Sequence, residues 1–573
     1  MWFKNFAALL LILYLTYPFK LQAAFPETSR FSLKSSITSL INHPQFNSAF
    51  WGIQIVSLQN NEILFTYNEK KRLPPASGMK LLVSAAALDH WGKDYQFKTP
   101  VFFEGRLDKK GRLLGNLVLV GKGDPNLEKR IYQPNVKKLI LYENSAFIES
   151  IADQIFEYGI RKIEGNVIAD TTLFLNEPFG RNWDYEDLLW GYGAPCSALA
   201  VHENSFNVSV FSGEAIGDPA IIEINPKQKK LDVINKVTTA PTEKGTDIRI
   251  GRDPTGTVLT VLGNISEKSP LLSYFLSISD PALNAASSLK LSLEKRGISV
   301  SGQSITRTLN PLEVMEQGDL SLEKARQKQI NYSPNNQISN WYSLPLIESL
   351  KILLKNSHNL YADMLLRGLG AEKSGVGTLT TGFNAIGTFL EKAGIAKAHL
   401  NLSDGSGLSR TNLLTPESIV RLLQFMDQHP QGQKFLESLA IAGKDGTLRH
   451  RMNNSSATGR VFAKTGSLRF VSSLCGYVQP LNNNEKIAFA IIDLSESTPI
   501  TLNPTSARDR ARVRPTNPKP TTQIFLDRTS DFAFNSFKSI TSNTRCLLST
   551  TTTFVKSVLD FLDLDNKDSR SVI

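Results

Sequence analysis

Cysteine is scarce in this sequence, with three in 573 residues. Cys196, Cys475 and Cys546 lie far apart and are odd in number, so they imply no disulfide framework. The metal-binding spacings Cys-x-x-Cys and His-Glu-x-x-His are both missing, and we therefore expect neither a metal nor a cofactor. The Gly-x-Ser-x-Gly motif is missing too, which leaves a hydrolase with a Ser-His-Asp triad without support.

Acidic residues are outnumbered, since 53 Asp and Glu stand against 64 Lys and Arg and the net charge is +11. This excess favours anionic surroundings such as a wall polymer, lipid headgroups or nucleic acid. The chain has no zinc-finger spacing and no basic-aromatic signature, so nucleic acid is not the expected partner. We expect association with a cell-wall or membrane surface instead.

An apolar run is found near the N-terminus. Lys4 precedes the run from Phe6 to Tyr17, and Leu21-Gln22-Ala23-Ala24 offers a small-residue cleavage site. This pattern predicts that residues 1–24 are a signal peptide and that the protein is exported, to the periplasm or another extracytoplasmic place. The run is short for a membrane span. Lys20 after it leaves an uncleaved anchor as the alternative.

The rest of the chain changes character twice. Residues 25–94 and 334–496 combine helices with a few strands, and we predict that these two separate segments form one catalytic domain. Short strands dominate residues 95–333, which we predict to be an inserted region of two nested, largely β domains. Residues 497–573 are rich in Pro, Thr, Ser and Arg and are predicted to be a linker and tail with a terminal helix at 554–562.

Periodicity and turn signals place the individual elements. We predict helices at 31–42, 78–88, 345–355, 360–368, 378–393 and 416–426, and strands at 50–56, 63–67, 101–103, 115–120, 167–169, 220–224, 258–262, 460–464, 471–478 and 487–494, with a hairpin turn at 481–484. A weak repeat, in which a helix ends at a glycine and a strand returns, is predicted at 151–167, 285–305 and 391–402. Gly121–Pro125 is predicted to be a surface loop, because no phosphate-binding pattern follows it.

The stretch from Pro74 to Leu88 carries the first candidate site. Two prolines hold its entry extended, and an apolar helix follows. Ser77 is predicted to lie at the start of that helix, where serine is favoured, and Lys80 shares its face three residues on. Because burial lowers the pKa of a lysine, Lys80 can take the proton from a Ser77 hydroxyl that attacks a carbonyl. The alternative is a capping serine beside a snorkelling lysine.

Two further motifs follow in a fixed order. Ser357-His358-Asn359 begins another apolar helix, and Lys464-Thr465-Gly466-Ser467 closes a strand. Ser-x-x-Lys, Ser-x-Asn and Lys-Thr-Gly, in this order, are the signature of the penicillin-recognising serine enzymes. Nearly half of the chain separates Lys80 from Ser357, whereas serine β-lactamases have a far shorter separation.

With this spacing, the chain resembles the D-alanyl-D-alanine carboxypeptidase/endopeptidases of low-molecular-mass class C, the penicillin-binding protein 4 type, over roughly residues 30–494. Further matching stretches are Leu119–Pro125, Ala194–Leu199, Ser403–Arg410 and Asp445–Leu448. The resemblance implies a mixed α/β (α+β) fold, in which a transpeptidase/β-lactamase-like domain has an antiparallel sheet flanked by helices. It also implies hydrolysis of the terminal D-Ala–D-Ala bond of peptidoglycan stem peptides, cleavage of cross-bridges, and covalent trapping by β-lactam antibiotics.

The resemblance assigns roles to the first two motifs. By it, Ser77 is the acylated nucleophile and Lys80 is its general base. Ser357 relays a proton toward the leaving group, and Asn359 holds the substrate amide.

The third motif faces the end of the substrate. By the resemblance, Lys464 and Thr465 bind the terminal carboxylate, and the backbone N–H groups of Ser77 and Ser467 form the oxyanion hole. The residue types agree with this, because a free carboxylate requires a fixed cation. Gly466 leaves room for a bound peptide to pair with the strand edge.

The sequence departs from the family pattern at three places. His358 stands where the family often has aspartate, Gly78 stands where threonine is frequent, and the chain after Leu494 does not match. Asp404 and Ser406 are expected to shape a loop beside the site rather than to react. Two alternatives stay open: a serine β-lactamase, and a non-catalytic wall-binding scaffold.

Overall fold

The computed structural model describes residues 27–134, 145–228, 231–316, 319–479 and 486–495. The predicted signal peptide, the hairpin turn at 481–484, Cys546 and the tail with its predicted helix at 554–562 lie outside these residues. Among the described residues, no helix is both long enough and apolar enough to cross a membrane.

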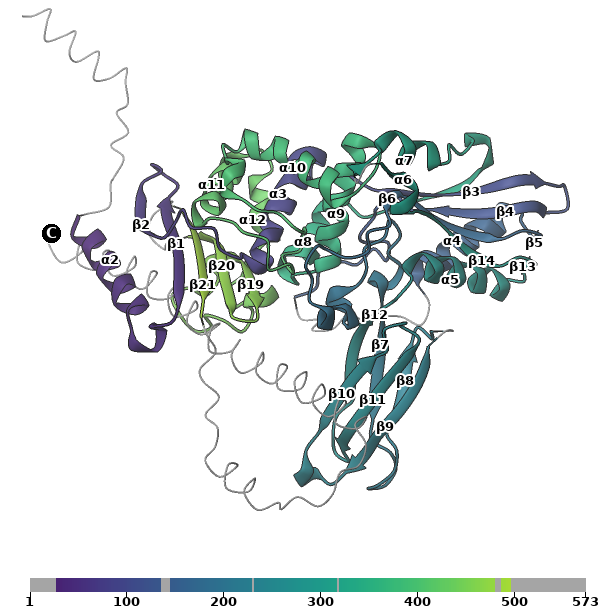
Figure 1. The fold of residues 1–573 in the computed structure, drawn as a ribbon, viewed down its shortest axis with the longest axis horizontal. Coiled ribbons are helices and arrows are strands. Elements are labelled where there is room, and N and C mark those ends of the chain that lie inside the picture. The colour runs from purple at the N-terminus through teal and green to yellow at the C-terminus, as the bar shows by residue number, and fades with distance from the viewer. Residues whose placement is uncertain (1–26, 135–144, 229–230, 317–318, 480–485, 496–573) are drawn as a thin grey trace, which may run out of the picture.

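A six-stranded antiparallel sheet stands near one end of the molecule (Figure 1). In spatial order its strands are β18 (Ala440–Ile441), β19 (Val461–Leu468), β20 (Val471–Val478), β21 (Ile487–Leu494), β1 (Phe50–Ser57) and β2 (Ile63–Tyr67). Strands β1 and β21 pair over their whole length, from Phe50 with Leu494 to Ser57 with Ile487. The first and the last strand of the described residues therefore lie side by side in one sheet.

Helices cover both faces of this sheet. On one face, Ile53 and Ile55 of β1 pack with α2 (Glu27–Ile41). On the other face, Cys475 and Tyr477 of β20 pack with the main helical layer. That layer contains α3 (Met79–Trp91), α8 (Leu346–Lys355), α9 (Asn359–Ser374), α10 (Leu379–Lys392), α11 (Pro416–Gln428) and α12 (Gly432–Ser438). Successive side chains of a strand point to opposite faces, so the central strands β1, β20 and β21 are buried along almost their whole length. The predicted fold class is confirmed.

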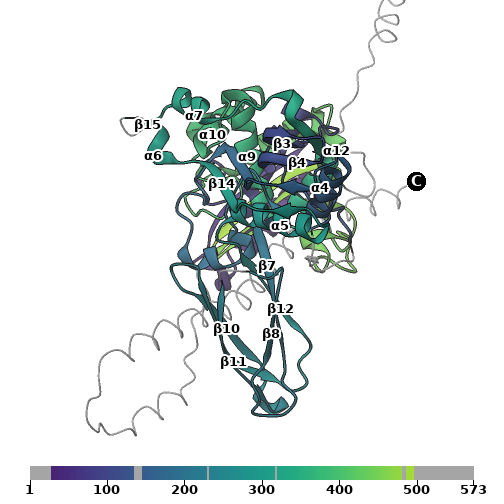
Figure 2. The same ribbon diagram turned by 90° about the vertical axis from the view of Figure 1, so that its right-hand side faces the viewer.

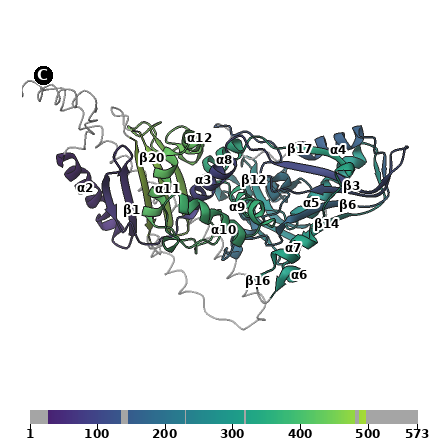
Figure 3. The same cartoon turned by 90° about the horizontal axis from the view of Figure 1, so that it is seen from above.

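A second, seven-stranded sheet stands at the opposite end, with α3, α8 and α9 between the two sheets (Figure 3). Its strands are β3 (Lys98–Leu107), β4 (Arg112–Val120), β5 (Lys162–Ile163), β6 (Val167–Leu175), β13 (Ser299–Val300), β14 (Ser304–Leu309) and β17 (Gln337–Tyr342). Helices α4 (Ala146–Glu157) and α5 (Pro281–Lys295) bury their apolar sides against it. Helix α9 connects the two ends, because Leu360 and Met364 pack with Phe174 of β6.

Two three-stranded sheets form a small sandwich that projects from the rest (Figure 2). One sheet contains β7 (Ser205–Phe211), β8 (Ile221–Asn225) and β12 (Leu272–Ser277), and the other contains β9 (Asp232–Ala240), β10 (Asp247–Arg252) and β11 (Val258–Ser266). The remaining short elements are α6 (Pro311–Val314), β15 (Met315–Glu316), β16 (Asp319–Leu320) and α7 (Leu322–Lys328).

Two of the sequence predictions about local structure are wrong. Gly121–Pro125 is not a surface loop, since all of it except Lys122 is buried and Asp124 is 1% exposed. The first two repeats do run from a helix into strands, but the third does not: after Gly394 ends α10, only an isolated bridge joins Asn401 to Leu413. The glycine stop is a local signal, whereas a return strand needs a sheet edge to pair with.

Candidate active site

The turn that carries Ser77 precedes a helix rather than capping it. Ser77 lies in the 3-10 turn Ala76–Gly78, and α3 begins at Met79 with Gly78 as its N-cap and no side-chain cap. Ser77 therefore lies at the helix start as predicted, and the alternative of a capping serine is wrong. Its hydroxyl instead accepts a hydrogen bond from Lys80 Nζ at 2.8 Å.

Two glycines let neighbouring chain segments enclose this turn. Gly407, with a φ of +82°, lies so close that a Cβ there would be 1.9 Å from the Ala76 carbonyl oxygen. A Cβ on Gly466 would be 2.6 Å from the Pro75 carbonyl oxygen. The turn is thus packed between a loop and β19, and this packing positions Ser77, which stays only half-buried.

Lys80 lies directly below the serine and is fully buried. Its Nζ donates to Ser77 Oγ at 2.8 Å, to Asn359 Oδ1 at 2.7 Å and to the Ser406 carbonyl at 2.5 Å. Burial lowers the pKa of Lys80 to about 7, although the negative charges of Asp404 and Asp363 oppose the shift. Lys80 can therefore lose its proton near neutral pH and act as a base.

Two side chains of the second motif, Ser357 and Asn359, contact the lysines of the other two motifs. Ser357 has a φ of +62°, a left-handed conformation that non-glycine residues seldom adopt. Its Oγ accepts a hydrogen bond from Lys464 Nζ at 2.8 Å. Asn359 is the first residue of α9, and besides binding Lys80 it donates through Nδ2 to the Tyr192 carbonyl at 2.8 Å.

The third motif lies on β19 beside the other two. Lys464 is fully buried, and burial, followed by the nearby charge of Lys80, lowers its pKa well below the usual value. Thr465 Oγ1 donates to Thr447 Oγ1 at 2.8 Å. Ser467 is exposed at the rim. The structure thus brings the three predicted motifs together in one site, linked by the hydrogen bonds of Lys80 to Ser77 and Asn359 and of Lys464 to Ser357.

Asp404 shapes the loop beside the site, as the sequence predicted. Its carboxylate accepts hydrogen bonds from the backbone of Gly407 and Ser409 and from the Trp183 side chain. Asp363 lies close to it, and burial together with the Asp404 charge raises the pKa of Asp363 to about 6. This acidic pair lowers the cost of burying a charged lysine nearby.

Sequence reasoning missed three residues that contact the motifs. Tyr192 supplies the carbonyl that binds Asn359, and Thr447 supplies the hydroxyl that receives Thr465. Glu203 binds the middle residue of the second motif. Thr447 lies within the matching stretch Asp445–Leu448, and Tyr192 lies two residues before the stretch that begins at Ala194, so this was the available signal for both. Glu203 had none.

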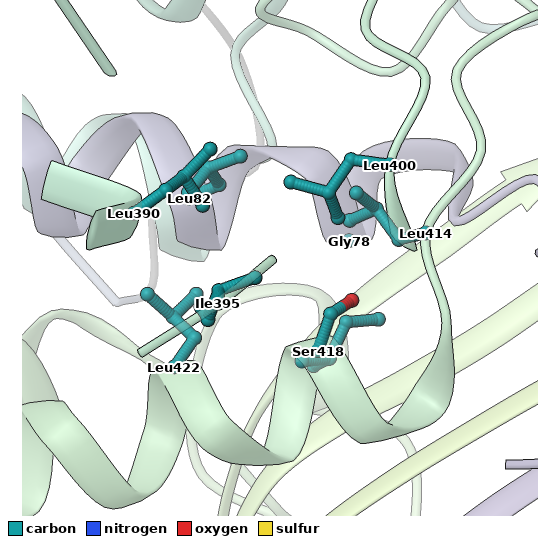
Figure 4. Close-up of a pocket in the computed structure, with 9 residues that line it drawn as sticks. Gly78, Leu82, Leu390, Ile395, Leu400, Leu414, Ser418 and Leu422 are labelled. Atoms are coloured by element: carbon teal, nitrogen blue, oxygen red, sulfur yellow. The ribbon is translucent and has the colours of Figure 1, made fainter. Parts of the chain in front are cut away.

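A narrow cavity beside α3 is not the reaction site. Figure 4 shows Gly78, just before α3, and Leu82 of α3 facing Ser418 and Leu422 of α11 across it, with Leu400 and Leu414 at one side. Its lining is almost wholly apolar and includes neither the serine nor the lysines of the motifs. It is a packing gap behind the catalytic helix.

In the described part of the chain, no three His, Cys, Asp or Glu side chains are grouped so that they could hold a metal ion. The chemistry that the cleft offers is instead nucleophilic. A half-buried serine hydroxyl lies within hydrogen-bond reach of an amine that can be neutral, and a second amine lies at the edge of a strand. Such a group can form and hydrolyse an acyl-enzyme.

A serine and lysine at a helix start, a Ser-x-Asn turn and a Lys-Thr-Gly strand around one cleft define a serine acyl-transferring enzyme of the penicillin-recognising class. The particular family is shown by comparison with known proteins. The chain belongs to the D-Ala-D-Ala carboxypeptidase 3 (S13) family, whose model matches residues 33–510.

Individual relatives extend over most of the chain. The D-alanyl-D-alanine carboxypeptidase of Actinomadura sp. (strain R39) is 30% identical over 493 residues, which are 84% of each protein. D-alanyl-D-alanine carboxypeptidase DacB of Haemophilus influenzae is 26% identical over 442 residues, covering 76% of this chain and 83% of that one. The crystal structure of penicillin binding protein 4 (dacB) from the same organism superposes with a TM-score of 0.66 at 24% identity, over 82% of this chain and 95% of that chain. The predicted family and the enzyme class, a D-Ala-D-Ala carboxypeptidase, are confirmed.

Proposed function

We propose that this enzyme removes the terminal D-alanine from peptidoglycan stem peptides through an acyl-enzyme on Ser77. The observation that carries the proposal is the buried Lys80, whose Nζ lies 2.8 Å from Ser77 Oγ and whose pKa is lowered to about 7 by burial. A serine hydroxyl is a weak nucleophile until a base takes its proton. The geometry supplies that base within reach.

The acylation half-reaction uses the first two motifs. Neutral Lys80 accepts the Ser77 proton while Oγ forms a bond to the carbonyl carbon of the penultimate D-alanine. The carbonyl oxygen becomes an oxyanion, for which the backbone N–H groups of Ser77 and Ser467 are the donors we propose. When the C–N bond breaks, protonated Lys80 gives up the proton it took from Ser77, and Ser357 relays a proton to the leaving amine, while Asn359 holds the substrate amide.

Hydrolysis then restores the enzyme. Water attacks the ester carbonyl carbon and gives a proton to Lys80, which is again neutral at that stage. The bond between Ser77 Oγ and the carbonyl carbon breaks, and Oγ regains a proton. The products are the shortened peptide and free D-alanine.

Substrate binding falls to the third motif. Lys464 and Thr465 bind the terminal carboxylate, and the arriving anion favours the charged form of Lys464. Strand β18 pairs with β19 only at Phe462 and Ala463, and among the described strands none pairs with the outer edge of β19 beyond these residues. A peptide can therefore add to that edge as an extra strand. The missing side chain of Gly466 makes room for the Ser77 turn rather than for the peptide, since a Cβ there would be 2.6 Å from the Pro75 carbonyl oxygen.

The same chemistry extends to three further properties. A cross-bridge presents the same acyl group with a larger amine leaving group, so we include endopeptidase activity. A β-lactam acylates Ser77 covalently, and the H. influenzae relative was solved with a β-lactam bound.

We also propose that the enzyme acts outside the cytoplasm, at the wall or membrane surface. Its catalytic domain consists of residues 25–94 and 334–496, and residues 95–333 are inserted between them.

The test is labelling with a fluorescent penicillin, followed by a D-alanine release assay on a peptide ending in D-Ala-D-Ala. Wild type should form a persistent adduct and release D-alanine, and Ser77→Ala should do neither. Ser84→Ala is the matched control, because Ser84 is a fully buried serine of α3, the helix that follows the Ser77 turn. It should be labelled like wild type.

Other outcomes would change the assignment. An adduct that forms and vanishes within seconds would favour a β-lactamase. Labelling of Ser77→Ala at the wild-type rate would refute Ser77 as nucleophile. Absence of both adduct and turnover in wild type would favour the non-catalytic scaffold.

A further inference from the structure

The middle residue of the second motif is held by a carboxylate from a distant part of the chain. His358 Nε2 lies 2.9 Å from Glu203 Oε2, and the Glu203 side chain is 4% exposed. Glu203 lies between β6 and β7, in the long stretch that separates the first two motifs. The His358 ring also packs against Tyr361, with 4.4 Å between the ring centroids.

The other oxygen of Glu203 is occupied as well. Tyr361 donates its hydroxyl to Oε1 at 3.0 Å, and the Arg130 guanidinium donates to the same atom. Burial alone would raise the pKa of Glu203, but His358 and Arg130 outweigh it and hold that pKa well below its ordinary value. A buried carboxylate with three donors stays ionised and has little freedom to move.

The backbone around Glu203 is strained. His202, Glu203 and Asn204 are three successive left-handed residues, with φ of 54°, 53° and 52°. Such conformations persist only where the surroundings impose them, and they concentrate at functional sites. Asn204 is tied down by its Nδ2, which donates to the Pro195 carbonyl at 2.8 Å. The strained turn delivers the Glu203 side chain to His358.

The contact acts on both neighbours of His358. On one side, Ser357 is itself left-handed, with a φ of 62°, and binds Lys464. On the other side, Asn359 binds Lys80. Because these side chains leave adjacent backbone positions, a displacement of His358 would move both of them away from the lysines.

We propose that Glu203 is a positioning residue for the reaction: it holds His358 so that Ser357 and Asn359 keep their places beside the reacting serine. This inference rests on the proposed function and adds a residue that acts through another and not on the substrate. It also makes the long stretch between the first two motifs part of the catalytic machinery, since that stretch supplies both Glu203 and its partner Arg130.

The test is a double-mutant cycle with Glu203→Gln, His358→Gln and the double variant, measuring kcat and KM for D-alanine release from a peptide ending in D-Ala-D-Ala. Glutamine keeps the volume of Glu203 and can still accept from Tyr361, but it loses the charge. Because small misplacements of catalytic groups are costly, each single variant should lower kcat about 10- to 100-fold, with KM within about twofold of wild type. The double variant should be no worse than either single variant, since both break one contact.

Asp170→Asn is the matched control. Asp170 is a carboxylate that is 1% exposed, accepts a tyrosine hydroxyl from Tyr332 and lies 3.6 Å from Arg307, but it is remote from the three motifs. It should lower the melting temperature to a similar extent and leave kcat unchanged. If only a general loss of stability were at work, Glu203→Gln and Asp170→Asn would change kcat to the same extent. A positioning role lowers kcat in Glu203→Gln alone.

Several results would overturn the proposal. One is that Glu203→Gln folds and its kcat stays within twofold of wild type. Another is that the fold-losses in kcat of the two single variants multiply in the double variant. If Glu203→Gln does not fold, His358→Gln provides the test, because His358 is more exposed than Glu203. An unchanged kcat in His358→Gln would overturn the proposal. Wild-type enzyme without turnover would refute the proposed function itself, and this inference with it.

Discussion

The molecule buries lysines in two different ways. In the cleft, Lys80 and Lys464 are fully buried, and the hydrogen bonds of each Nζ described above go to hydroxyl, amide or carbonyl oxygens. At the end of α8, Lys355 is 4% exposed, and its Nζ lies 2.6 Å from a carboxylate oxygen of Asp445. Burial lowers the pKa of all three lysines, but for Lys355 the hydrogen bond and charge of Asp445 directly oppose the shift.

The difference teaches what a partner does to a buried amine. A lysine next to a carboxylate keeps its proton and holds two segments together, whereas a lysine among neutral oxygens gives up its proton more easily. The first arrangement builds structure, and Lys355 ties the end of α8 to the Asp445 turn. The second arrangement builds a base. The two sites can be separated by experiment, because one should govern rate and the other stability.

The largest expected effect is that of Lys80→Met. It removes the base while keeping an apolar stem of similar length, and we expect penicillin acylation to slow about 10³- to 10⁴-fold. The measurement is the adduct formation rate, with circular dichroism to check the fold. Stability should not fall, because methionine needs no desolvated charge at a fully buried position. Acylation within tenfold of wild type would refute Lys80 as the base.

Lys355→Met should lower stability and change the acylation rate little, which is the opposite of what we expect for Lys80→Met. It leaves Asp445 without its buried cation, so we expect the free energy of unfolding to fall by about 3–5 kcal/mol in a denaturant titration. The acylation rate of the folded protein should change less than tenfold. Adding Asp445→Asn should restore part of the stability. A double variant no more stable than Lys355→Met would show that the ion pair is not the reason for the loss.

Gly407→Ala should disturb the cleft through the backbone. A Cβ there would lie 1.9 Å from the Ala76 carbonyl oxygen and push the Ser77 turn away from its lysine, so we expect acylation to slow about 10²-fold. Gly394→Ala is the matched control, because Gly394 is also left-handed but a Cβ there meets nothing within 4 Å. It should cost about 1–2 kcal/mol of stability, because alanine is strained in a left-handed conformation, and leave the rate unchanged. Equal rates for the two variants would contradict the packing argument.

The smallest expected effect is on pH dependence. Lys80 acts when unprotonated, so the acylation rate should rise about tenfold per pH unit below pH 7 and level off above the pKa of about 7. Stability should follow in the same direction. Because the folded pKa lies below the usual value of 10.5, the unfolded chain binds more protons between these values, and the contribution of Lys80 to stability rises with pH across that window. A rate that falls as pH rises from 6 to 8 would contradict a neutral lysine.

Local patterns were enough for much of the fold. The strands at 471–478 and 487–494 are present with the predicted bounds, because continuous apolar runs between turn signals mark buried strands. Helix α9 is longer than predicted, since it continues to Ser374 through Gly368 and Gly370, which a sequence-based reading takes as a stop. The alternative of a capping Ser77 is wrong, because Ser77 lies in a 3-10 turn before α3. That turn packs against Gly407 and Gly466, which are remote in sequence.

The sequence by itself determined the three motifs, their order, the family and the class of reaction, because each motif is a run of adjacent residues whose chemistry can be read directly. The apolar helix also predicted that burial lowers the pKa of Lys80, but only the tertiary structure decided that Lys80 and Lys464 are both fully buried and which oxygens their amines contact. It alone brought Glu203 to His358, 155 positions away. Burial and long-range contacts depend on which segments pack together, and that is a property of the whole fold rather than of any stretch of the chain.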